Sequence, residues 1–546
     1  MSELRVVPLG GLGEIGLNLL VLEYGDTAVA IDCGVMFPDD KMLGVDVAIP
    51  DTTYLDSLGE RLRAVLLTHA HEDHIGALPY VLPRHRVPVY GTPLTLGFVR
   101  ERLREHDVQA DLRRYDDAPI TIGPLSIEPF AVTHSIPDAV GLVIETPVGT
   151  VVHTGDFKID QTPLDGRRPD LGRLAALGDR GVLLLFSDST NVEVEGATPS
   201  ERTVSAGFDA IFSQATGRVV VTTFSSHIHR IQQVIDQAAR HRRQVALVGR
   251  SLVSHVGVAR ELGLLRVPPG TLVDVGELAA LPRERVALIT AGSQAEPGSA
   301  LVRIATGEHK QVTLSPGDTV VLSSRVIPGN ERAIGNLVNH LCRRDAVVHY
   351  GHRAPVHVSG HASREELKLV LGLVRPTHFV PVHGEYRHLL GHCQLATEMG
   401  VPMTHCHLLE DGDVLTLDGR STWRPDRVPS GRVLVDGKGV GEVEDIVLRD
   451  RKHLSSDGIV LAVLAVAQSG ELVLEPQLLS RGVVAEEAIA RVHEAALSEV
   501  RAALDELGPE ARTDANEVAS EVRRALRRHF RRLQRRPVVL PLVLEM

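Results

Sequence analysis

The sequence predicts an α/β protein of several domains, in which an inserted α/β domain interrupts the first domain and a small α+β domain follows. Residues 1–191 alternate strand-like and helix-like segments, and residues of the types that bind metals stand where predicted strands end. A matching histidine, His383, comes only after a long interval with its own strand-helix rhythm, so the first domain must close in space around an insertion. After about Arg451, two strand-like runs and two long helices are predicted, at 485–507 and 514–533.

The most informative segment of the first domain is the loop at residues 68–74, which reads Thr-His-Ala-His-Glu-Asp-His. In an extended turn alternate side chains point the same way, so His69 and His71 can meet on one metal ion. Asp73 and His74 then face a second ion. The run does not fit the H-E-x-x-H register of a metalloprotease helix. The loop therefore indicates a centre for two metal ions, and the alternative is a solvated histidine-rich loop.

The segments on either side place this loop at the carboxyl end of a strand. Residues 63–68 predict a buried strand, and residues 75–80 open a short helix. Folds of the α/β class tend to hold their sites at such strand-to-helix loops. We therefore expect further ligands at the ends of other strands.

Candidate ligands do follow other apolar stretches. Asp32 closes a predicted strand, His134 and Asp156 each end another, and His383 lies in the stretch 379–384. An aspartate has two oxygens, so Asp156 can bridge two cations. Taken singly, each residue is more often a cap or a hydrogen-bonding group. Together, behind the histidine-rich loop, they favour a dinuclear metal centre.

This order of motifs resembles that of the metallo-β-lactamase superfamily. That superfamily has a strand-end aspartate, an H-x-H-x-D-H loop, a histidine, a second aspartate and a late histidine. The matching residues here are Asp32, His69, His71, Asp73, His74, His134, Asp156 and His383. The resemblance implies a dinuclear metallohydrolase built on an αββα sandwich.

Three later segments narrow the resemblance to the β-CASP branch, whose members cut nucleic acids. They look like its motifs A, B and C and lie at residues 186–191, 357–362 and 381–385. Asp188, His361 and His383 stand at the matching positions. The glycine-rich opening at 8–16 and the phrase Met-Phe-Pro-Asp-Asp at 36–40 are most similar to the ribonuclease J family. This similarity covers nearly the whole chain.

The predicted fold class is α/β: a metallo-β-lactamase αββα sandwich split by an inserted α/β β-CASP domain, plus a small C-terminal α+β domain. In the insert, a strand at 218–223, a helix at 228–239 and a strand at 244–248 are predicted. We expect this domain to cover the metal cleft. The predicted boundaries are 1–191 and 349–420 for the two parts of the metallo-β-lactamase domain, 192–348 for the β-CASP domain, 421–450 for a linker and 451–546 for the C-terminal domain.

Imidazole and carboxylate ligands favour two Zn²⁺ ions per subunit, with Mn²⁺ or Mg²⁺ as alternatives for activity. The predicted metal ligands are His69, His71 and His134 at one ion and Asp73, His74 and His383 at the other, with Asp156 between them. We expect Asp32 and Asp188 to orient ligand histidines. The predicted catalytic residues are Asp73, Asp188 and His361. His361 either protonates the leaving oxygen or contacts a phosphate, and both roles remain open.

The resemblance implies a ribonuclease that works 5′ to 3′, prefers 5′-monophosphate ends and also cleaves internally, in mRNA decay and in RNA maturation such as rRNA processing. The predicted substrate-binding residues, which would form a 5′-phosphate pocket, are Ser226, His229, His357, Ser359, Gly360 and His361. For the serine-rich stretch 224–230 the alternative is N-capping of the next helix. Two other functions stay open: a DNA-processing β-CASP nuclease, which the histidine at motif C disfavours, and a catalytically silent RNA-degradation scaffold, which the complete ligand set disfavours.

The composition agrees with a cytoplasmic enzyme. The chain has 546 residues, 43% of them hydrophobic, and its longest apolar stretch, 459–467, is too short to span a bilayer. The N-terminus lacks a signal-peptide pattern. Four cysteines without a C-x-x-C pair indicate no disulfide framework, and Cys406 between two histidines is interpreted as structural. The expected partners are single-stranded RNA, a second copy in a homodimer or larger homo-oligomer as the family implies, and proteins of an RNA-degradation complex, with no membrane.

The glycine run at 11–16 also matches the dinucleotide fingerprint G-x-G-x-x-G, but its context excludes that interpretation. A dinucleotide-binding run opens a helix, whereas residues 18–25 and 27–31 predict two short strands joined at a Gly-Asp turn. The run is better interpreted as a loop between strands, where the backbone can approach the metal cleft or the substrate. The sequence contains no P-loop pattern, so ATP hydrolysis has no support.

The net charge of −12 is unusual for a protein that binds RNA, so the distribution of charge matters more than its sum. The strongest basic cluster is 523–536, where Val522, Leu526 and Phe530 recur at helical spacing beside many arginines. Three interpretations remain: an RNA-tracking face, a solvated helix packed on its own domain, or a membrane-surface helix, which the acidic chain disfavours. Only 3% of the residues are aromatic, so extensive base stacking is not expected.

Overall fold

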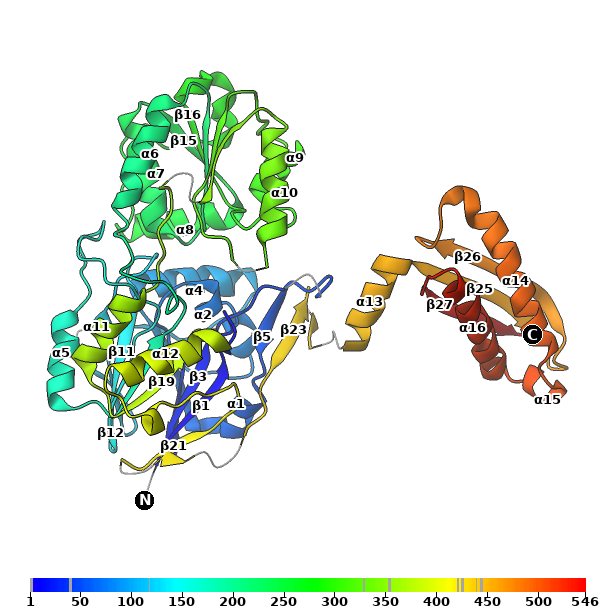
Figure 1. The fold of residues 1–546 in the computed structure, drawn as a ribbon, viewed down its shortest axis with the longest axis horizontal. Helices are drawn as coiled ribbons and strands as arrows, with labels where there is room; N and C mark the ends of the chain where they lie inside the picture. The colour runs from blue at the N-terminus through cyan, green and yellow to red at the C-terminus, as the bar shows by residue number, and fades with distance from the viewer. Residues whose placement is uncertain are drawn as a thin grey trace. The chain divides into compact units, whose positions relative to one another are not determined.

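Two β-sheets, packed face to face, form the framework of the N-terminal part of the chain in a computed structural model (Figure 1). The structure describes residues 3–38, 42–116, 118–327, 329–351, 355–419, 422–423, 427–437, 439–441 and 445–546. These residues fall into two compact units. The first comprises Met1–Phe37 and Ala48–Val433, and the second comprises Pro38–Val47 and Leu434–Met546. The chain passes between them three times: between Phe37 and Pro38, within β5 (Val47–Pro50) and within β23 (Arg432–Asp436).

The two sheets of the first unit have mixed strand directions. The first sheet contains, in spatial order, β22 (Thr422–Trp423), β21 (Leu415–Leu417), β1 (Leu4–Gly10), β3 (Leu19–Tyr24), β4 (Thr27–Ile31), β6 (Leu62–Leu66), β7 (Val89–Gly91) and β8 (Leu112–Arg114). The second contains β19 (His378–Val382), β13 (Leu184–Asp188), β12 (Gly149–His153), β11 (Val140–Thr146), β10 (Leu125–Ala131) and β9 (Ile120–Ile122). Because β19 pairs with β13, residues after the insertion complete a sheet begun before it.

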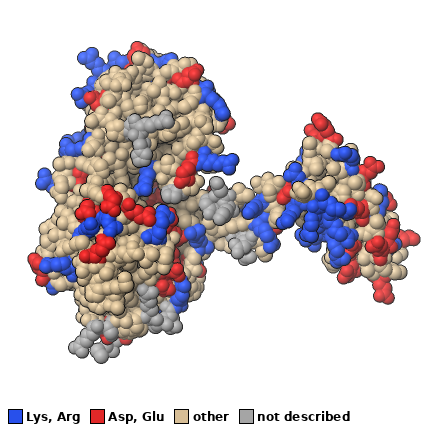
Figure 2. All heavy atoms as spheres, in the orientation of Figure 1, with Lys and Arg blue, Asp and Glu red and all other residues tan. Residues whose placement is uncertain are grey.

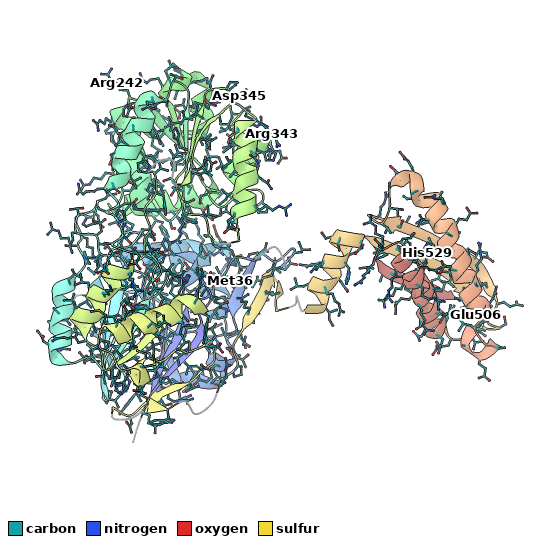
Figure 3. All side chains as sticks on the ribbon, in the orientation of Figure 1. Met36, Arg242, Arg343, Asp345, Glu506 and His529 are labelled. Carbon is teal, nitrogen blue, oxygen red and sulfur yellow. The ribbon has the colours of Figure 1, made fainter. Side chains whose placement is uncertain are left out.

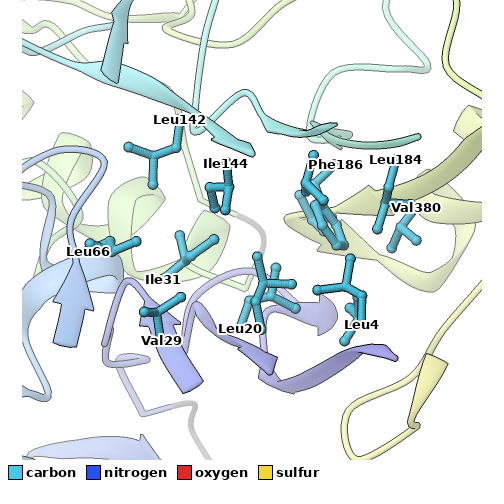
Figure 4. Packing of buried hydrophobic residues seen from close by; sticks show 14 of the residues in the cluster. Leu4, Leu20, Val29, Ile31, Leu66, Leu142, Ile144, Leu184, Phe186 and Val380 are labelled. Carbon is cyan, nitrogen blue, oxygen red and sulfur yellow. The ribbon is translucent and has the colours of Figure 1, made fainter. Parts of the chain in front are cut away.

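The core of the first unit lies between these sheets (Figure 4). Leu20 and Ile31 of the first sheet belong to the same buried cluster as Leu142, Phe186 and Val380 of the second. Strands β4 and β13 are buried along their whole length, which explains why they appear in the sequence as continuous apolar runs. Full burial of a valine, leucine, isoleucine or phenylalanine side chain in this core contributes about 1.5–3 kcal/mol.

Helices cover the outer faces of the sandwich. On the first sheet these are α1 (Thr53–Leu58), α2 (Glu72–Ile75), α3 (Leu78–Val81) and α4 (Pro93–Glu105), and on the second α5 (Leu171–Arg180), α11 (Arg364–Val374) and α12 (Tyr386–Glu398). Helix α4 contacts β7 and β8, and α12 contacts β19. The predicted αββα sandwich is therefore confirmed.

The insertion is an α/β domain, as predicted, and the strands of its sheet are parallel. Its sheet has the order β15 (Gln244–Val248), β16 (Val286–Thr290), β14 (Val219–Thr222), β17 (Thr319–Leu322) and β18 (Val347–His349). The accompanying helices are α6 (Thr203–Gln214), α7 (Ile228–Arg240), α8 (Arg250–Glu261), α9 (Ala300–Thr306) and α10 (Glu331–Cys342). The domain has its own apolar core, which includes Val220, Leu288 and Val320. It meets the sandwich where the ring of His255 on α8 stacks on Phe98 of α4, with 3.9 Å between ring centroids.

The second unit is a small α+β domain, which confirms that part of the predicted fold class. Its sheet has the order β26 (Leu472–Arg481), β25 (Ile459–Val466) and β27 (Val538–Glu545), and its helices are α13 (Asp445–Asp457), α14 (Ile489–Asp505), α15 (Pro509–Arg512) and α16 (Ala515–Arg532). The expectation of two strands was wrong, because β27 is a third. Pro541 obscured this strand in the sequence. An edge strand such as β27 tolerates proline because the backbone N–H groups on its outer side need no partner in the sheet.

Two further predictions fall partly on residues that the structure does not describe. In the predicted linker, 421–450, the structure has β22, β23, β24 (Gly439–Val440) and the start of α13, while residues 421, 424–426, 438 and 442–444 lie outside the described part. The same holds for Asp39 and Asp40 of the Met-Phe-Pro-Asp-Asp phrase. Among the described residues, no helix combines the length and apolar character needed to cross a membrane.

Candidate metal centre

The histidine-rich loop follows β6 and leads directly into helix α2. His71 is extended and is the residue before α2, and its carbonyl accepts the backbone N–H groups of His74 and Ile75 at 2.9 and 3.0 Å. The extended geometry predicted for the loop therefore holds at His71. For Asp73 and His74 it is wrong, because these two residues lie in the helix, and the helix expected at 75–80 begins earlier and is broken into α2 and α3.

The loop brings its first two histidines together with residues from two other strands. His69, His71, His134 and Asp156 offer ligand atoms that all lie within 4.8 Å of one another. His71 Nδ1 lies 3.1 Å from both His69 Nε2 and His134 Nε2. His134 and Asp156 follow β10 and β12 of the second sheet. The face-to-face packing of the sheets thus brings these ligands to one edge of the sandwich.

Neighbouring groups orient the ligand histidines. His134 Nδ1 donates to the carbonyl of Gly360 at 2.8 Å, which leaves the Nε2 lone pair directed at the other ligands. The hydroxyl of Thr68 donates to Asp32 and receives the Nδ1–H of His69 at 3.0 Å, with the same consequence for His69. Both rings are thus set for metal coordination through Nε2.

A second group lies next to the first and shares Asp156 with it. Asp73, His74, Asp156 and His383 also have ligand atoms within 4.8 Å. His74 Nε2 lies 3.3 Å from Asp156, and His383 Nε2 lies 3.3 Å from Asp73. The other nitrogen of His74 donates to Asp32 at 2.8 Å, as expected of an orienting carboxylate.

Burial sets the protonation state of the first group. Desolvation lowers the pKa of His71 to about 4 and lowers the pKa values of His69 and His134 well below the usual range. These imidazoles are therefore neutral at pH 7. Each keeps a lone pair for a cation.

Carboxylates dominate the second group. Burial alone would lower the pKa of His383, but Asp156 and hydrogen bonds with Asp188 and Asp73 raise it to about 10. Burial would likewise raise the pKa of Asp156, yet His383 and His74 hold it well below its usual range. In the metal-free protein, protons on histidines thus balance the buried carboxylates. A cation would displace those protons, so the donor sets of both groups fit divalent metal ions.

A third group connects the centre to the β-CASP motifs. Asp156, Asp188, His361 and His383 again have ligand atoms within 4.8 Å. His361 Nδ1 donates to Asp188 at 2.8 Å, and Asp188 in turn accepts from the backbone N–H and hydroxyl of Thr190. The side chain of His361 is 21% exposed and that of Asp73 is 28% exposed, whereas Asp156 is 3% exposed. His361 and Asp73 therefore lie at the solvent side of the centre.

Backbone geometry fixes the loops that carry these ligands. Asp32 and His383 have positive φ angles of 60° and 54°, which non-glycine residues seldom adopt. The glycine run supports the second of them, because the His383 N–H donates to the carbonyl of Gly11 at 3.1 Å and β2 (Leu12–Gly13) pairs with β20 (Gly384–Glu385). This confirms that the run is a loop between strands that approaches the metal cleft.

Close packing leaves no room for a side chain at Gly360. A Cβ atom there would lie 2.8 and 2.9 Å from Cε1 and Nδ1 of His134. We therefore expect Gly360→Ala to displace His134 and to lower the metal content, measured by mass spectrometry of the purified protein, by about one ion per chain. Gly335→Ala, where a Cβ meets nothing within 4 Å, is the matched control. Full metal loading of Gly360→Ala would contradict this assignment of His134.

The residues predicted to bind substrate fall into two places. Three of them lie beside the centre: Ser359 contacts Asn191, Gly360 contacts His134, and His361 contacts Asp188. His229 lines a neighbouring cavity together with Lys158 and His134. His357 has a buried Nδ1 without a hydrogen-bond partner among the described residues, and burial lowers its pKa to about 3. Ser226 is partly exposed and does not line this cavity.

In the serine-rich stretch 224–230, the residue that caps the next helix is a histidine. His227 is the N-cap of α7, and its Nδ1 accepts the backbone N–H of Arg230 at 3.3 Å. Neither Ser225 nor Ser226 is the N-cap. The helix therefore begins at Ile228, as predicted, and a residue of the stretch caps it.

Several residues of the centre were not predicted. Thr68 and Thr190 hold Asp32 and Asp188, Ser135 lies 3.3 Å from His71, and Asn18 donates to the carbonyl of Asp73 at 3.0 Å. Thr68, Thr190 and Ser135 each stand within two residues of a motif residue. That adjacency was the signal that could have found them.

The fold and the centre together define a class: a metallo-β-lactamase-fold protein in which an α/β insertion separates Asp188 from His361 and His383 of the site. Comparison with known families agrees. Residues 13–185 match the metallo-beta-lactamase superfamily, 216–341 the ribonuclease J beta-CASP domain, 348–408 the Zn-dependent metallo-hydrolase RNA specificity domain, and 446–546 the ribonuclease J C-terminal domain.

Comparison with individual proteins identifies the family within this class. The chain is 41% identical to ribonuclease J of Helicobacter pylori (strain ATCC 700392 / 26695) over 489 residues, which cover 88% of this chain and 71% of that protein. It is 43% identical to ribonuclease J2 of Bacillus subtilis (strain 168), with 88% of each covered. The chain belongs to the ribonuclease J family.

A solved structure supports the fold alone. A protein of unknown function from Enterococcus faecalis V583 superimposes with a TM-score of 0.52 at 17% sequence identity, covering 76% of this chain and all of that one.

Proposed function

We propose that this chain is a metal-dependent ribonuclease that hydrolyses RNA phosphodiesters at a centre for two Zn²⁺ ions, both from the 5′ end and internally. One observation carries the proposal: Asp156 belongs to both potential ligand groups, and the β-CASP pair Asp188 and His361 lies against it. Family membership supports RNA as the substrate. We also propose that the chain works as a homodimer or larger homo-oligomer, with partners in an RNA-degradation complex.

The proposed ligands divide as the two groups do. His69, His71 and His134 would hold one ion, and Asp73, His74 and His383 the other, with Asp156 between them. When bound, the two cations would stabilise negative charge on the phosphodiester and lower the pKa of a water molecule. Asp32 and Asp188 would keep the ligand and catalytic imidazoles in place.

Two partly exposed residues of the centre, Asp73 and His361, would accept and donate the protons of the reaction. Water attacks the phosphorus, and the bond from phosphorus to the 3′ oxygen breaks, so the downstream product carries a 5′-phosphate. Asp73, at the solvent side, would accept the proton of the attacking water. His361 would give a proton to the departing 3′ oxygen, and its hydrogen bond to Asp188 at 2.8 Å would hold the ring in position.

Preference for a 5′-monophosphate would arise from donors one nucleotide away from the centre. The hydroxyl of Ser359 accepts from Asn191 at 2.8 Å and from the backbone N–H of His361 at 3.1 Å. Its own O–H is therefore free to donate to a phosphate oxygen. Gly360, His357, Ser226 and His229 are the other proposed members of this pocket.

One experiment tests both the activity and the pocket. Purified protein is incubated with 5′- and 3′-labelled single-stranded RNA and DNA carrying a 5′-hydroxyl, monophosphate or triphosphate. We expect cleavage of RNA, fastest with the monophosphate, and loss of cleavage on chelation. In Ser359→Ala the advantage of the monophosphate should fall about 10-fold or more, because a hydrogen bond to a charged group contributes about 1.5–3 kcal/mol.

The control is Ser213→Ala, an exposed serine on α6. It should behave as the unmodified protein does. Equal rates on RNAs with the three kinds of 5′ end would refute the 5′-phosphate pocket but not the ribonuclease activity. Preference for DNA would favour the DNA-processing alternative, and no cleavage of either polymer by the metal-loaded protein would favour the scaffold.

A further inference from the structure

Helix α16 in the C-terminal unit is divided sharply between an apolar and a basic side. Val518, Val522, Leu526 and Phe530 are at most 1% exposed and belong to the core of this unit. His529, labelled in Figure 3, also turns toward α14, where its Nδ1 lies 2.7 Å from Glu499. The exposed arginines of the helix and of the residues after it are Arg523, Arg524, Arg527, Arg528, Arg531, Arg532, Arg535 and Arg536.

These arginines form two rows with different surroundings. Arg524 and Arg528 pair with Glu521, and Arg532 pairs with Glu499. The other row, Arg523, Arg527 and Arg531, has no carboxylate partner among the described residues. Arg535 and Arg536 extend this unpaired row beyond the helix. Figure 2 shows the corresponding blue atoms gathered where Figure 1 labels α16.

Helix stability does not account for the unpaired row. Cations near the C-terminus of a helix interact favourably with its dipole, but that effect is confined to about the last turn and applies to Arg531 alone in this row. Arg527 and Arg523 lie about one and two turns earlier, where like charges four residues apart are destabilising by about 0.2–0.5 kcal/mol per pair. The row thus opposes the stability of the unit, which indicates an anionic partner.

The geometry suits a linear polyanion. Residues four apart on a helix are separated by about 6 Å along its axis, so the row presents regularly spaced guanidinium groups. Guanidinium binds phosphate with two parallel hydrogen bonds. A membrane surface is disfavoured, because it would need an apolar side of the helix to insert, and that side is used by the core.

We propose that the unpaired arginine row of α16, Arg523, Arg527 and Arg531 with Arg535 and Arg536, binds the phosphates of single-stranded RNA. The row would hold a part of the substrate that does not lie in the metal centre. This inference rests on the proposed ribonuclease function for the identity of the polymer. Because the contacts are with phosphates, binding is independent of base sequence and decreases with salt.

The test compares two triple variants of the full chain that remove the same charge from the same helix. One is Arg523→Gln/Arg527→Gln/Arg531→Gln, and the other is Arg524→Gln/Arg528→Gln/Arg532→Gln, whose arginines already have glutamate partners. Glutamine and arginine have similar helix propensities, so both variants should fold, which circular dichroism checks. Binding of a 30-nucleotide RNA is measured in the presence of a chelator, at several salt concentrations.

We expect the first variant to bind the RNA at least about 10-fold more weakly at low salt. The slope of the logarithm of affinity against the logarithm of salt concentration should fall by about 2, since each phosphate contact with a single strand contributes about 0.7. The second variant should change affinity less than about 3-fold. Equal effects of the two variants, or none, would overturn the proposal. So would loss of binding to phosphatidylserine vesicles without loss of RNA binding.

The same variants separate this inference from the proposed function. Cleavage of a trinucleotide, which is too short to reach beyond the metal centre, should be the same in the first variant as in the unmodified protein. If the unmodified protein cleaves no RNA, the proposed function fails, but the comparison of salt slopes still decides whether α16 binds the polymer. If cleavage is normal and the slopes are unchanged, only the arginine row is refuted.

Discussion

Asp156→Ala is expected to abolish RNA cleavage, with a fall in kcat/KM of at least about 10⁴-fold. Asp156 lies within reach of both ligand groups, so its loss removes a shared carboxylate from two sites at once. Each metal ion contributes several kcal/mol of transition-state stabilisation, and every 1.36 kcal/mol is a factor of ten in rate. Metal content should fall with the activity. Single-turnover cleavage of 5′-labelled RNA and mass spectrometry of the bound metal are the measurements.

The fold should survive this substitution. Asp156 is 3% exposed, but the core of the sandwich lies between the sheets and does not include it. Circular dichroism should therefore be unchanged. Asp179→Ala, which removes an exposed carboxylate on α5, is the control and should keep both metal and activity. Turnover by purified, metal-free Asp156→Ala would refute the two-metal proposal.

The second large effect is expected from His361→Ala, which should slow cleavage by about 10²–10⁴-fold while leaving the metal content unchanged. His361 is the exposed member of its pair with Asp188 and lies outside the two groups that we propose bind the metals. Loss of a proton donor affects kcat far more than the affinity for RNA. Measurement of kcat and KM together with metal content separates this role from that of a ligand.

A substrate with sulfur in place of the 3′ bridging oxygen distinguishes the two roles of His361. A thiolate is a good leaving group without a proton, so this substrate should restore most of the rate of His361→Ala if the histidine is the acid. If His361 only contacts a phosphate, the variant will be equally slow on both substrates and KM will rise. Thr190→Ser, which keeps the hydroxyl that holds Asp188, is the control for altered positioning.

Much of the centre could be predicted because its ligands are local. One loop contains four of them, His69, His71, Asp73 and His74. Three more, His134, Asp156 and Asp32, each end an apolar stretch, so the pattern of apolar residues already indicated that they stand at strand ends. The insert was equally visible as an interruption between Asp156 and His383. Parallel strands place their carboxyl ends at one edge of a sheet, which is why residues at strand ends converge.

Other features escaped because they depend on partners far away in the chain. The carbonyl that orients His134 belongs to Gly360, 226 residues later, and nothing near either residue indicates the contact. Asp73 and His74 entered a helix because backbone hydrogen bonds to His71 closed there, against the extended pattern expected. Strand β27 was hidden by Pro541 and became a strand only through pairing with β25.

The sequence by itself determined the family, the fold class and the identities of the residues that converge on the metal centre, because these depend on residue type, order and period. Tertiary structure decided which candidate ligands lie within reach of one another, since that grouping follows from distances across the two packed sheets. It also decided which arginines of α16 lack a carboxylate partner in the described part of the chain, because the glutamates that pair with the others act through space as well as along the helix. Whether two charged side chains pair depends on the distance between them in the folded protein, which their spacing in the sequence does not give.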